Sequence, residues 1–252
     1  MRFEKIHFAA SRAETAQEAL ADLTGRYGQV PRYAADVIVA LGGDGFMLQV
    51  LHEGSELPVY GMNRGSVGFM MNDYVPDDLP ERLSEAEQAV IYPLAMRAQT
   101  VDGRLHEALA INEVALLRAG PQAAKLQISV NGKVRMPELI CDGAILSTPA
   151  GSTAYNYSAY GPILPIGAGV LALTGIASFR PRRWRGAILP ASAVVRFDVL
   201  EAEKRPVMAD ADSRSVAPVS WVEVRSEPKV MHRILFDPGH GLEERLMREQ
   251  FA

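Results

Sequence analysis

The strongest constraint on the fold lies between residues 141 and 155, where an apolar strand runs directly into a turn of small residues. Ala144 to Leu146 is typical of a short buried strand. In the segment that follows, Pro149 and Gly151 favour a turn, and Ser152 or Thr153 can cap a following helix. Such a turn collects backbone N–H groups and hydroxyls, which suits a ligand rich in oxygen, such as a nucleotide. The alternative is an ordinary strand-turn-helix joint, which small polar residues alone would favour.

A second turn, Gly42-Gly43-Asp44-Gly45, follows a strand predicted over Asp36 to Leu41. It leads into the apolar segment Phe46 to Leu51, which looks like the start of a helix. Glycines at the carboxyl end of a strand let the backbone approach a phosphate chain, and the carboxylate of Asp44 then projects into the site. On its own the motif is weak evidence, because glycines next to aspartate are common in turns.

Two further blocks complete a pattern. Asn63-Arg64-Gly65-Ser66-Val67-Gly68-Phe69 follows a third strand, and Asn112-Glu113 ends the run Ala108 to Ile111. Together with Asp142-Gly143 and the segment Ser147 to Tyr155, these blocks occur in the order found in the NAD kinases. The chain resembles that family from about Asp36 to its final strands. NAD kinases transfer a phosphoryl group to the adenosine 2′-hydroxyl of NAD.

The resemblance implies a role for each block. Asp44 matches the aspartate that is read as the general base. Phosphoryl transfer depends mostly on positioning and charge stabilisation, and a carboxylate beside the hydroxyl can accept its proton late. The alternative for Asp44 is a turn residue that bonds its own backbone. The other matched residues are expected to bind NAD or the donor phosphates: Gly42, Gly43, Gly45, Phe69, Asn112, Glu113, Asp142, Thr153, Ala154, Tyr155 and Ser158.

The side chains in this set suit such a role. Glu113 can accept hydrogen bonds from ribose hydroxyls, although an isolated Asn-Glu pair would indicate a solvated strand end. Tyr155 offers a ring face and a hydroxyl, and Ser158 lies one helical turn beyond Ala154. Phe69 is expected to line the pocket, with a position in the core as the alternative.

Some positions depart from the commonest family pattern. Many members carry a hydroxyl residue where Ala150 stands, and many carry an arginine where this chain has Ile140. Phosphate charge must then be met elsewhere, and the arginines of Pro181-Arg182-Arg183-Trp184-Arg185 are candidates. The alternative, that this segment is only a basic loop exposed to solvent, has at least equal weight. Asp212 matches an aspartate that in the family often precedes a ligand-contacting residue.

Residues 1–90 alternate between strands and helices. Strands are predicted over Phe3 to Ala9, before the strand at Asp36 in the sequence, and over Leu57 to Met62, after it. Ser11 and Glu14 have capping-box spacing ahead of a helix. The alternation indicates a parallel α/β unit, whose ligands lie beyond the carboxyl ends of its strands. A charged helical segment is predicted over Pro76 to Ala89.

From Val90 onward, short strands and turn signals replace this alternation. Hairpin turns are predicted at 101–104 and 130–133, and later strands over 187–189, 194–200, 220–224 and 231–236. This pattern is typical of an antiparallel sheet or sandwich. We therefore expect a Rossmann-like α/β domain with a parallel sheet over 1–90 and a β-rich, NAD-binding β-sandwich domain over 91–240. As the resemblance implies, a helix over 241–252 is expected to pack back on the first domain.

The composition is ordinary for a globular protein: 252 residues, 48% hydrophobic and 22% charged. A net charge of −4 argues against a large basic face for nucleic acid. The single cysteine, Cys141, permits no intrachain disulfide, fits a reducing cytoplasm and is expected to be a buried thiol. No signal peptide or membrane-spanning run is recognisable. The 5 histidines are scattered without ligand spacing, so no metal site built from protein side chains is predicted.

The sequence thus indicates an NAD kinase that uses ATP, with polyphosphate as a further candidate donor and Mg²⁺ held largely by donor phosphates and water. The resemblance also implies a homodimer or homotetramer, and no nucleic-acid or membrane partner is expected. Lipid kinases of the diacylglycerol and sphingosine type share the Gly-Gly-Asp-Gly turn but lack the Gly-Ser-Thr-Ala-Tyr block. A non-catalytic NAD or NADP sensor stays open because of Ala150 and Ile140. A dehydrogenase is disfavoured, because no Gly-x-Gly-x-x-Gly follows the first strand.

Overall fold

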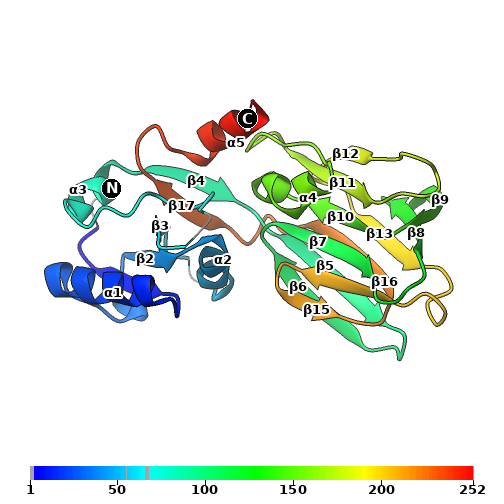
Figure 1. The fold of residues 1–252 in the computed structure, drawn as a ribbon, viewed down its shortest axis with the longest axis horizontal. Coiled ribbons are helices and arrows are strands. Elements are labelled where there is room, and N and C mark those ends of the chain that lie inside the picture. The colour runs from blue at the N-terminus through cyan, green and yellow to red at the C-terminus, as the bar shows by residue number, and fades with distance from the viewer. Residues whose placement is uncertain (1–2, 55, 66–67, 252) are drawn as a thin grey trace. The chain divides into compact units, whose positions relative to one another are not determined.

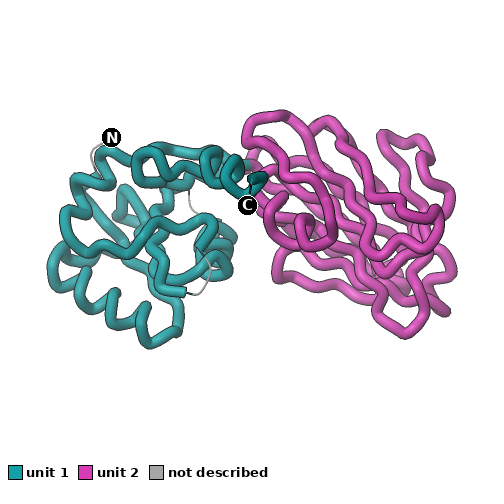
Figure 2. The backbone as a smooth tube through the Cα atoms, turned by 45° about the horizontal axis from the view of Figure 1, so that its top comes forward, with its two compact units in different colours: residues 1–91, 231–252 teal, residues 92–230 magenta. Residues whose placement is uncertain are grey.

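The structure, a computed structural model, describes residues 3–54, 56–65 and 68–251. It divides into two compact units, Met1–Ile91 with Met231–Ala252, and Tyr92–Val230 (Figure 2). We call them the first and the second unit. Both ends of the chain therefore belong to the first unit. The predicted β-rich range, 91–240, was too long at its carboxyl end, because the strand at 231–236 joins the sheet of the first unit.

The first unit is built on a five-stranded sheet (Figure 1). Four strands run parallel and β4 is antiparallel to β17, in the order β1 (Ile6–Ala10), β2 (Val37–Gly42), β3 (Val59–Asn63), β17 (His232–Phe236) and β4 (Glu87–Ile91). All residues of β2 are buried, as expected for an apolar strand covered on both faces. Gly42 and Asn63 are register partners at the carboxyl ends of β2 and β3, so the predicted parallel α/β unit is confirmed.

Among the described residues, the helical segments of the first unit are α1 (Glu14–Tyr27), the 3₁₀ turn η1 (Arg32–Ala34), α2 (Asp44–His52), α3 (Leu79–Glu85) and α5 (Leu242–Gln250). Ala16, Ala19 and Leu23 of α1 are buried in the same core as Val37 and Val39 of β2. The predicted capping box is wrong, because α1 follows Ala13 and has no side-chain cap. The helix predicted over 76–89 was too long, since Glu87–Ile91 pairs with β17 as strand β4.

The second unit contains two six-stranded antiparallel sheets. The first, which we call the turn-bearing sheet, has the order β12 (Gly186–Pro190), β11 (Val170–Ile176), β10 (Gly143–Ser147), β7 (Glu113–Arg118), β14 (Val207–Ala211) and β15 (Arg214–Val216). The second has the order β6 (Leu105–Ala110), β5 (Leu94–Thr100), β16 (Val219–Ser226), β13 (Val195–Val199), β8 (Ala124–Val130) and β9 (Lys133–Cys141). Side chains from both sheets form one core, so the predicted β-sandwich is confirmed.

Alternation along the strands decides which face of the turn-bearing sheet is buried in this core. Val114 and Leu116 of β7 and Ala144 and Leu146 of β10 belong to the core. Their neighbours Glu113, Ala115 and Ile145 point to the opposite face, because successive side chains of a strand alternate. The short segments η2 (Ala150–Thr153) and α4 (Tyr155–Ser158) follow β10. The predicted hairpin turns lie between β5 and β6 and between β8 and β9, and Asn131 and Gly132 both have positive φ.

Candidate active site

Asp44 lies at the junction between β2 and α2 in the first unit. Gly43 is the N-cap, and Asp44 is the first residue of α2, so the helix begins inside the glycine motif and not at Phe46 as predicted. The Asp44 carboxylate accepts the Phe69 N–H at Oδ2 and the Met70 N–H at Oδ1, both at 2.8 Å. Each carboxylate oxygen can accept a further hydrogen bond. The side chain is therefore oriented by the backbone while it keeps acceptor capacity.

The glycines of this motif differ in what the fold requires of them. A Cβ on Gly42 would come within 2.8 Å of the Phe46 Cβ, so packing against α2 explains that glycine. A Cβ on Gly45 would meet no described atom within 4 Å. Packing within the described residues therefore does not explain Gly45, whereas close approach of a ligand would.

The block from Asn63 to Phe69 folds back towards the glycine motif. The Arg64 N–H donates to the Gly42 carbonyl at 2.7 Å, and a Cβ on Gly65 would lie 3.1 Å from Gly43 Cα. Ser66 and Val67 lie outside the described residues. Phe69 is only partly buried, so it is not a core residue, and its N–H is one of the two that hold Asp44.

Asn112 and Glu113 form the corner between β6 and β7 in the second unit, and the carboxylate of Asp212 holds that corner. It accepts the N–H groups of Ile111 at 2.7 Å, Asn112 at 3.0 Å and Glu113 at 3.3 Å. Asp212 follows β14 and has a φ of 51°, a left-handed conformation that aspartate tolerates better than most residues. Asp212, which the family resemblance singled out, thus organises the Asn-Glu corner through its carboxylate.

Glu113 occupies an environment that disfavours its charge. Its Oε2 is buried and has no hydrogen-bond partner among the described residues. Burial first, and then the charge of Asp212, raises the pKa of Glu113 to about 8. Near neutral pH, Glu113 therefore carries a proton for much of the time and can donate a hydrogen bond as well as accept one.

This raised pKa predicts a pH-dependent stability. Between the ordinary glutamate pKa of 4.5 and about 8, the folded protein holds a proton that the unfolded chain releases, so the free energy of unfolding decreases as the pH rises. We expect a loss on the order of 3 kcal/mol between pH 5 and pH 8 from this group. Glu113→Gln should remove this component, so the variant should gain stability relative to the wild type towards pH 9. Urea unfolding at pH 5, 6.5, 8 and 9 measures the difference, and parallel curves for the two proteins would contradict it.

The turn after β10 is packed onto this same corner. The Thr148 hydroxyl donates to the Ile111 carbonyl at 2.7 Å and accepts the Gly151 N–H at 3.0 Å. A Cβ on Gly151 would lie 2.3 Å from the Asn112 carbonyl oxygen. Gly151 is therefore required by the close approach of two backbone segments.

Three hydroxyls at the turn are used inside the protein, contrary to the prediction that the turn gathers its hydroxyls at a ligand. Ser147, Thr148 and Ser152 are buried. The Ser152 hydroxyl donates to the Pro149 carbonyl at 2.7 Å and accepts the Leu164 N–H at 3.0 Å. Neither Ser152 nor Thr153 caps α4, whose N-cap is Ala154.

The matched residues beyond the turn remain accessible. Thr153 and Ala154 are partly buried, and Tyr155 and Ser158 are exposed. Burial raises the pKa of the Tyr155 hydroxyl, with further contributions from the charges of Glu113, Asp210 and Asp142. Within the second unit, the structure therefore brings Tyr155 into the electrostatic environment of two other predicted site residues, Glu113 and Asp142.

Asp142 has a cationic partner that the sequence did not suggest. Arg118 Nε lies 2.7 Å from Asp142 Oδ1, and both side chains are more than a third exposed. Arg118 ends β7, which pairs with β10 so that Leu117 lies opposite Gly143. Only strand pairing brings the two residues together, so no local motif could have revealed Arg118.

The departures from the family pattern have different structural settings. Ala150 is 5% exposed and begins η2, so a contact from its side chain to ligand would require the turn to open. Ile140 pairs with Arg180, and its N–H donates to the Arg180 carbonyl at 2.8 Å. The arginines of the predicted basic loop, Arg182, Arg183 and Arg185, are all exposed. Either proposed role, phosphate binding or a solvated loop, is compatible with that exposure.

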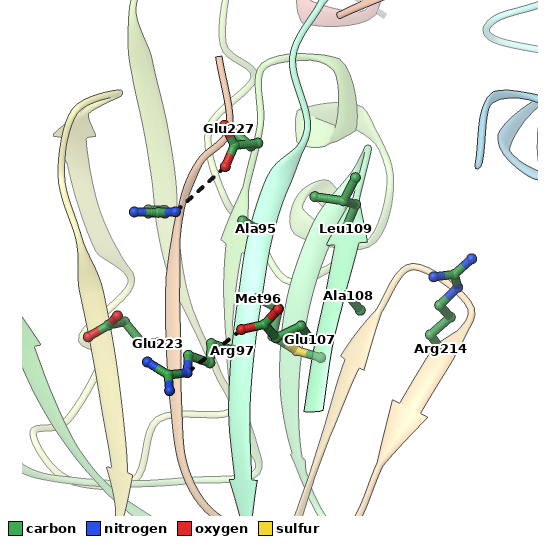
Figure 3. A pocket seen from close by; sticks show the side chains of 10 residues that line it. Ala95, Met96, Arg97, Glu107, Ala108, Leu109, Arg214, Glu223 and Glu227 are labelled. Atoms are coloured by element: carbon green, nitrogen blue, oxygen red, sulfur yellow. Dashed lines mark ion pairs between the residues drawn. The ribbon is translucent and has the colours of Figure 1, made fainter. Parts of the chain in front are cut away.

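Two other features of the described residues bear on alternative chemistry, Cys141 and a pocket in the second unit. Cys141 is buried, as predicted, and burial raises the pKa of its thiol to about 12, so it is a poor nucleophile. A pocket of about 470 Å³ in the second unit contains none of the predicted site residues (Figure 3). Its charged lining includes the ion pairs Arg97–Glu107 at 3.8 Å and Arg225–Glu227 at 3.6 Å. Among the described residues, none of the helices has the length and apolar character needed to cross a lipid bilayer.

Comparison with known proteins gives the same assignment for both halves of the chain. The family model described as the ATP-NAD kinase N-terminal domain matches residues 1–89, and that for the ATP-NAD kinase C-terminal domain matches residues 111–232. An NAD kinase of Cereibacter sphaeroides is 69% identical over 251 residues, covering 99% of each chain. An NAD kinase of Caulobacter vibrioides is 58% identical over 250 residues, covering 98% of this chain and 96% of the relative.

Solved structures agree on the fold. Yeast NADH kinase complexed with NADH has a TM-score of 0.84 at 19% identity, covering 100% of this chain and 88% of the other. An NAD kinase from Archaeoglobus fulgidus in complex with ATP has a TM-score of 0.75 at 22% identity, covering 98% and 97%. With both domain models matched and relatives of such high identity along the whole length, the chain belongs to the NAD kinase family.

Proposed function

We propose that this protein transfers the γ-phosphoryl group of ATP to the adenosine 2′-hydroxyl of NAD, forming NADP and ADP. Its membership of the NAD kinase family supports the reaction. The structural observation that carries the proposal is the Asp44 carboxylate, oriented at the carboxyl end of β2 by two backbone N–H groups. Ligands of parallel α/β sheets bind beyond this end of the strands.

We assign Asp44 the role of general base. As the 2′-oxygen forms a bond to the γ-phosphorus, the bond from that phosphorus to the β–γ bridging oxygen breaks, and its electron pair leaves with ADP. The proton of the 2′-hydroxyl passes to an Asp44 oxygen and then to solvent. Because the attacking oxygen has formed little of its bond to phosphorus in the loose transition state, the hydroxyl loses its proton late, and an ordinary carboxylate in a fixed position suffices as acceptor.

We assign dinucleotide binding to the second unit. Asn112 and the partly buried Glu113 present polar side chains at the corner held by Asp212. Such groups suit ribose hydroxyls, which can both donate and accept. Asp142, Thr153, Ala154, Tyr155 and Ser158 complete the proposed NAD-binding set, and Tyr155 supplies an accessible ring face.

Gly45 allows a test of the proposed phosphate contact. Gly45→Ala should leave the free energy of unfolding unchanged or raise it by up to about 1 kcal/mol, since alanine favours a helix and an added Cβ has open space. If the phosphate chain lies against this backbone, the methyl group should lower kcat/KM by about tenfold or more, equivalent to about 1.4 kcal/mol. Gly25→Ala, in α1, is the matched control, because its Cβ also meets no described atom within 4 Å. Equal kcat/KM in the two variants would contradict the contact at Gly45.

We propose that magnesium enters with ATP as part of the substrate. The described residues contain no group of three or more His, Cys, Asp or Glu side chains that could hold a metal ion. Magnesium usually keeps several waters and binds nucleotide phosphates together with few protein carboxylates. Bound in that way, it neutralises phosphate charge during transfer.

The decisive assay measures NADP formation from NAD, ATP and magnesium, with NADH and polyphosphate as alternative substrates. We expect turnover with NAD and ATP. A protein that binds the dinucleotide tightly but forms no product with either donor would be a sensor, and the kinase proposal would fail. We also infer that the protein forms a homodimer or homotetramer and acts in the cytoplasm. Size-exclusion chromatography with light scattering would test the first inference, and cell fractionation the second.

A further inference from the structure

The C-terminal helix α5 places a guanidinium against the segment that holds Asp44. Arg245 Nη1 donates to the carbonyls of Gly68 and Phe69, both at 3.1 Å. Its Nε donates to the His240 carbonyl at 2.8 Å, and its guanidinium carbon lies 5.3 Å from the centre of the Phe236 ring. Arg245 is thus fixed by hydrogen bonds to two backbone segments and by contact with one aromatic ring of the first unit.

The carbonyls that Arg245 binds belong to the same peptide groups that bind Asp44. The peptide between Gly68 and Phe69 accepts from Arg245 at its C=O and donates to Asp44 Oδ2 at its N–H. The next peptide, between Phe69 and Met70, does the same with Asp44 Oδ1. Two parallel hydrogen-bond relays therefore connect the cation to the carboxylate.

We propose that Arg245 is a positioning residue for Asp44, acting through these two peptide groups. A hydrogen bond to a carbonyl polarises the peptide and strengthens its N–H as a donor. Arg245 thereby holds both N–H groups on the carboxylate and fixes the direction in which Asp44 presents its remaining acceptor positions. This inference rests on the proposed function, in which Asp44 accepts the proton of the NAD hydroxyl.

The surroundings of Arg245 fit this role better than that of a surface ion pair. The side chain is half-buried, and burial lowers its pKa, while the charges of Asp73, Asp44 and Asp237 act in the opposite direction. A guanidinium nevertheless stays protonated in proteins. The anchoring of α5 has a separate source, because Leu242 and Leu246 of the same helix are buried. Loss of the guanidinium should therefore leave the helix packed.

The test uses the whole 252-residue chain with Arg245→Ala, Arg245→Lys and the control Arg248→Ala. Arg248, three residues along α5, is 65% exposed and pairs with Glu244 at 3.0 Å. We expect Arg245→Ala to lower kcat at least tenfold with little change in the KM for NAD or ATP, and Arg248→Ala to leave both near wild type. Lysine should restore little, since one ammonium cannot reproduce the fork that reaches two carbonyls and His240.

Chemical rescue gives a second kinetic readout. Arg245 lines a pocket of about 290 Å³ together with Asp73, Asp237, His240 and Arg248. Added guanidinium at millimolar concentration should enter the space left in Arg245→Ala and raise its kcat several-fold, with no such gain for the wild type or Arg248→Ala. Absence of any gain would count against a role for the guanidinium group itself.

A double-mutant cycle separates positioning from general stability. With Asp44→Ala as background, Arg245→Ala should change the residual kcat less than twofold, because its effect passes through the missing carboxylate. An equal loss of kcat in both backgrounds would overturn the proposal. Failure of the proposed function looks different: the wild type would form no NADP, or Asp44→Ala would retain full activity.

Hydrogen exchange of the Phe69 and Met70 amides gives a readout that does not depend on turnover. If the exchange rates of these two amides were the same in Arg245→Ala as in the wild type, that result alone would overturn the inference.

Discussion

Replacing Asp44 with asparagine is expected to lower kcat for NADP formation by about 10²- to 10⁴-fold, the usual contribution of a general base. The amide cannot accept the proton of the 2′-hydroxyl, while the residues proposed to bind NAD in the second unit are unchanged. The Kd for NAD, measured by calorimetry, should therefore stay within about threefold of wild type, equivalent to about 0.7 kcal/mol. A variant that keeps wild-type kcat would remove Asp44 from the chemistry.

The Asp44 variant needs a structural control, because the carboxylate also holds two backbone N–H groups. An asparagine can accept a hydrogen bond from only one of these N–H groups, because its NH₂ group, which is a donor, would face the other N–H. Asp36→Asn is a control in the same unit: Asp36 Oδ2 alone accepts the N–H groups of Glu4 at 3.2 Å and Lys5 at 3.1 Å, so one amide oxygen can keep both. Asp44→Asn should lose about 1 kcal/mol of stability, Asp36→Asn should lose less, and only Asp44→Asn should lose turnover.

The elements of the fold were largely predictable because their signals are local. The fully apolar strand β2, the glycines that end it and the hairpin at Asn131-Gly132 follow from periodicity and turn chemistry. The sheet to which a strand belongs is a different matter. The apolar pattern of β17 is equally compatible with either unit, and only its pairing with β3 and β4 assigns it to the first.

The candidate site was predictable only where a motif lies within one stretch of chain. Asp44, Asn112 and Tyr155 stand inside such motifs, whereas their supporting groups come from far away in the sequence. Arg245 reaches Phe69 across 176 residues. The hydroxyls of the turn after β10 were assigned to a ligand because sequence cannot reveal that the Asn112 backbone lies beside them and accepts their hydrogen bonds.

Asp212 is another supporting group that lies far in the sequence from the residues it holds, and Asp212→Ala is the substitution with the largest expected effect on stability. One carboxylate at Asp212 accepts three backbone N–H groups from a corner 99 to 101 residues away. Hydrogen bonds to a charged group contribute about 1.5–3 kcal/mol, and alanine at a positive φ adds about 1 kcal/mol of strain. We expect Asp212→Ala to lower the free energy of unfolding by about 3–4 kcal/mol in urea titrations. A loss below about 1 kcal/mol would contradict the role of Asp212 in holding the corner.

Asp212→Asn separates the charge from the backbone conformation. Asparagine tolerates positive φ and keeps one oxygen, so the expected order of stability is wild type, then asparagine, then alanine. Both variants remove the neighbouring negative charge that contributes to the raised pKa of Glu113. That pKa, followed by NMR titration, should fall from about 8 yet stay above 4.5, because burial is its larger cause. A Glu113 pKa that does not move in Asp212→Asn would show that burial alone keeps this carboxyl protonated, and that the corner's electrostatics do not depend on Asp212.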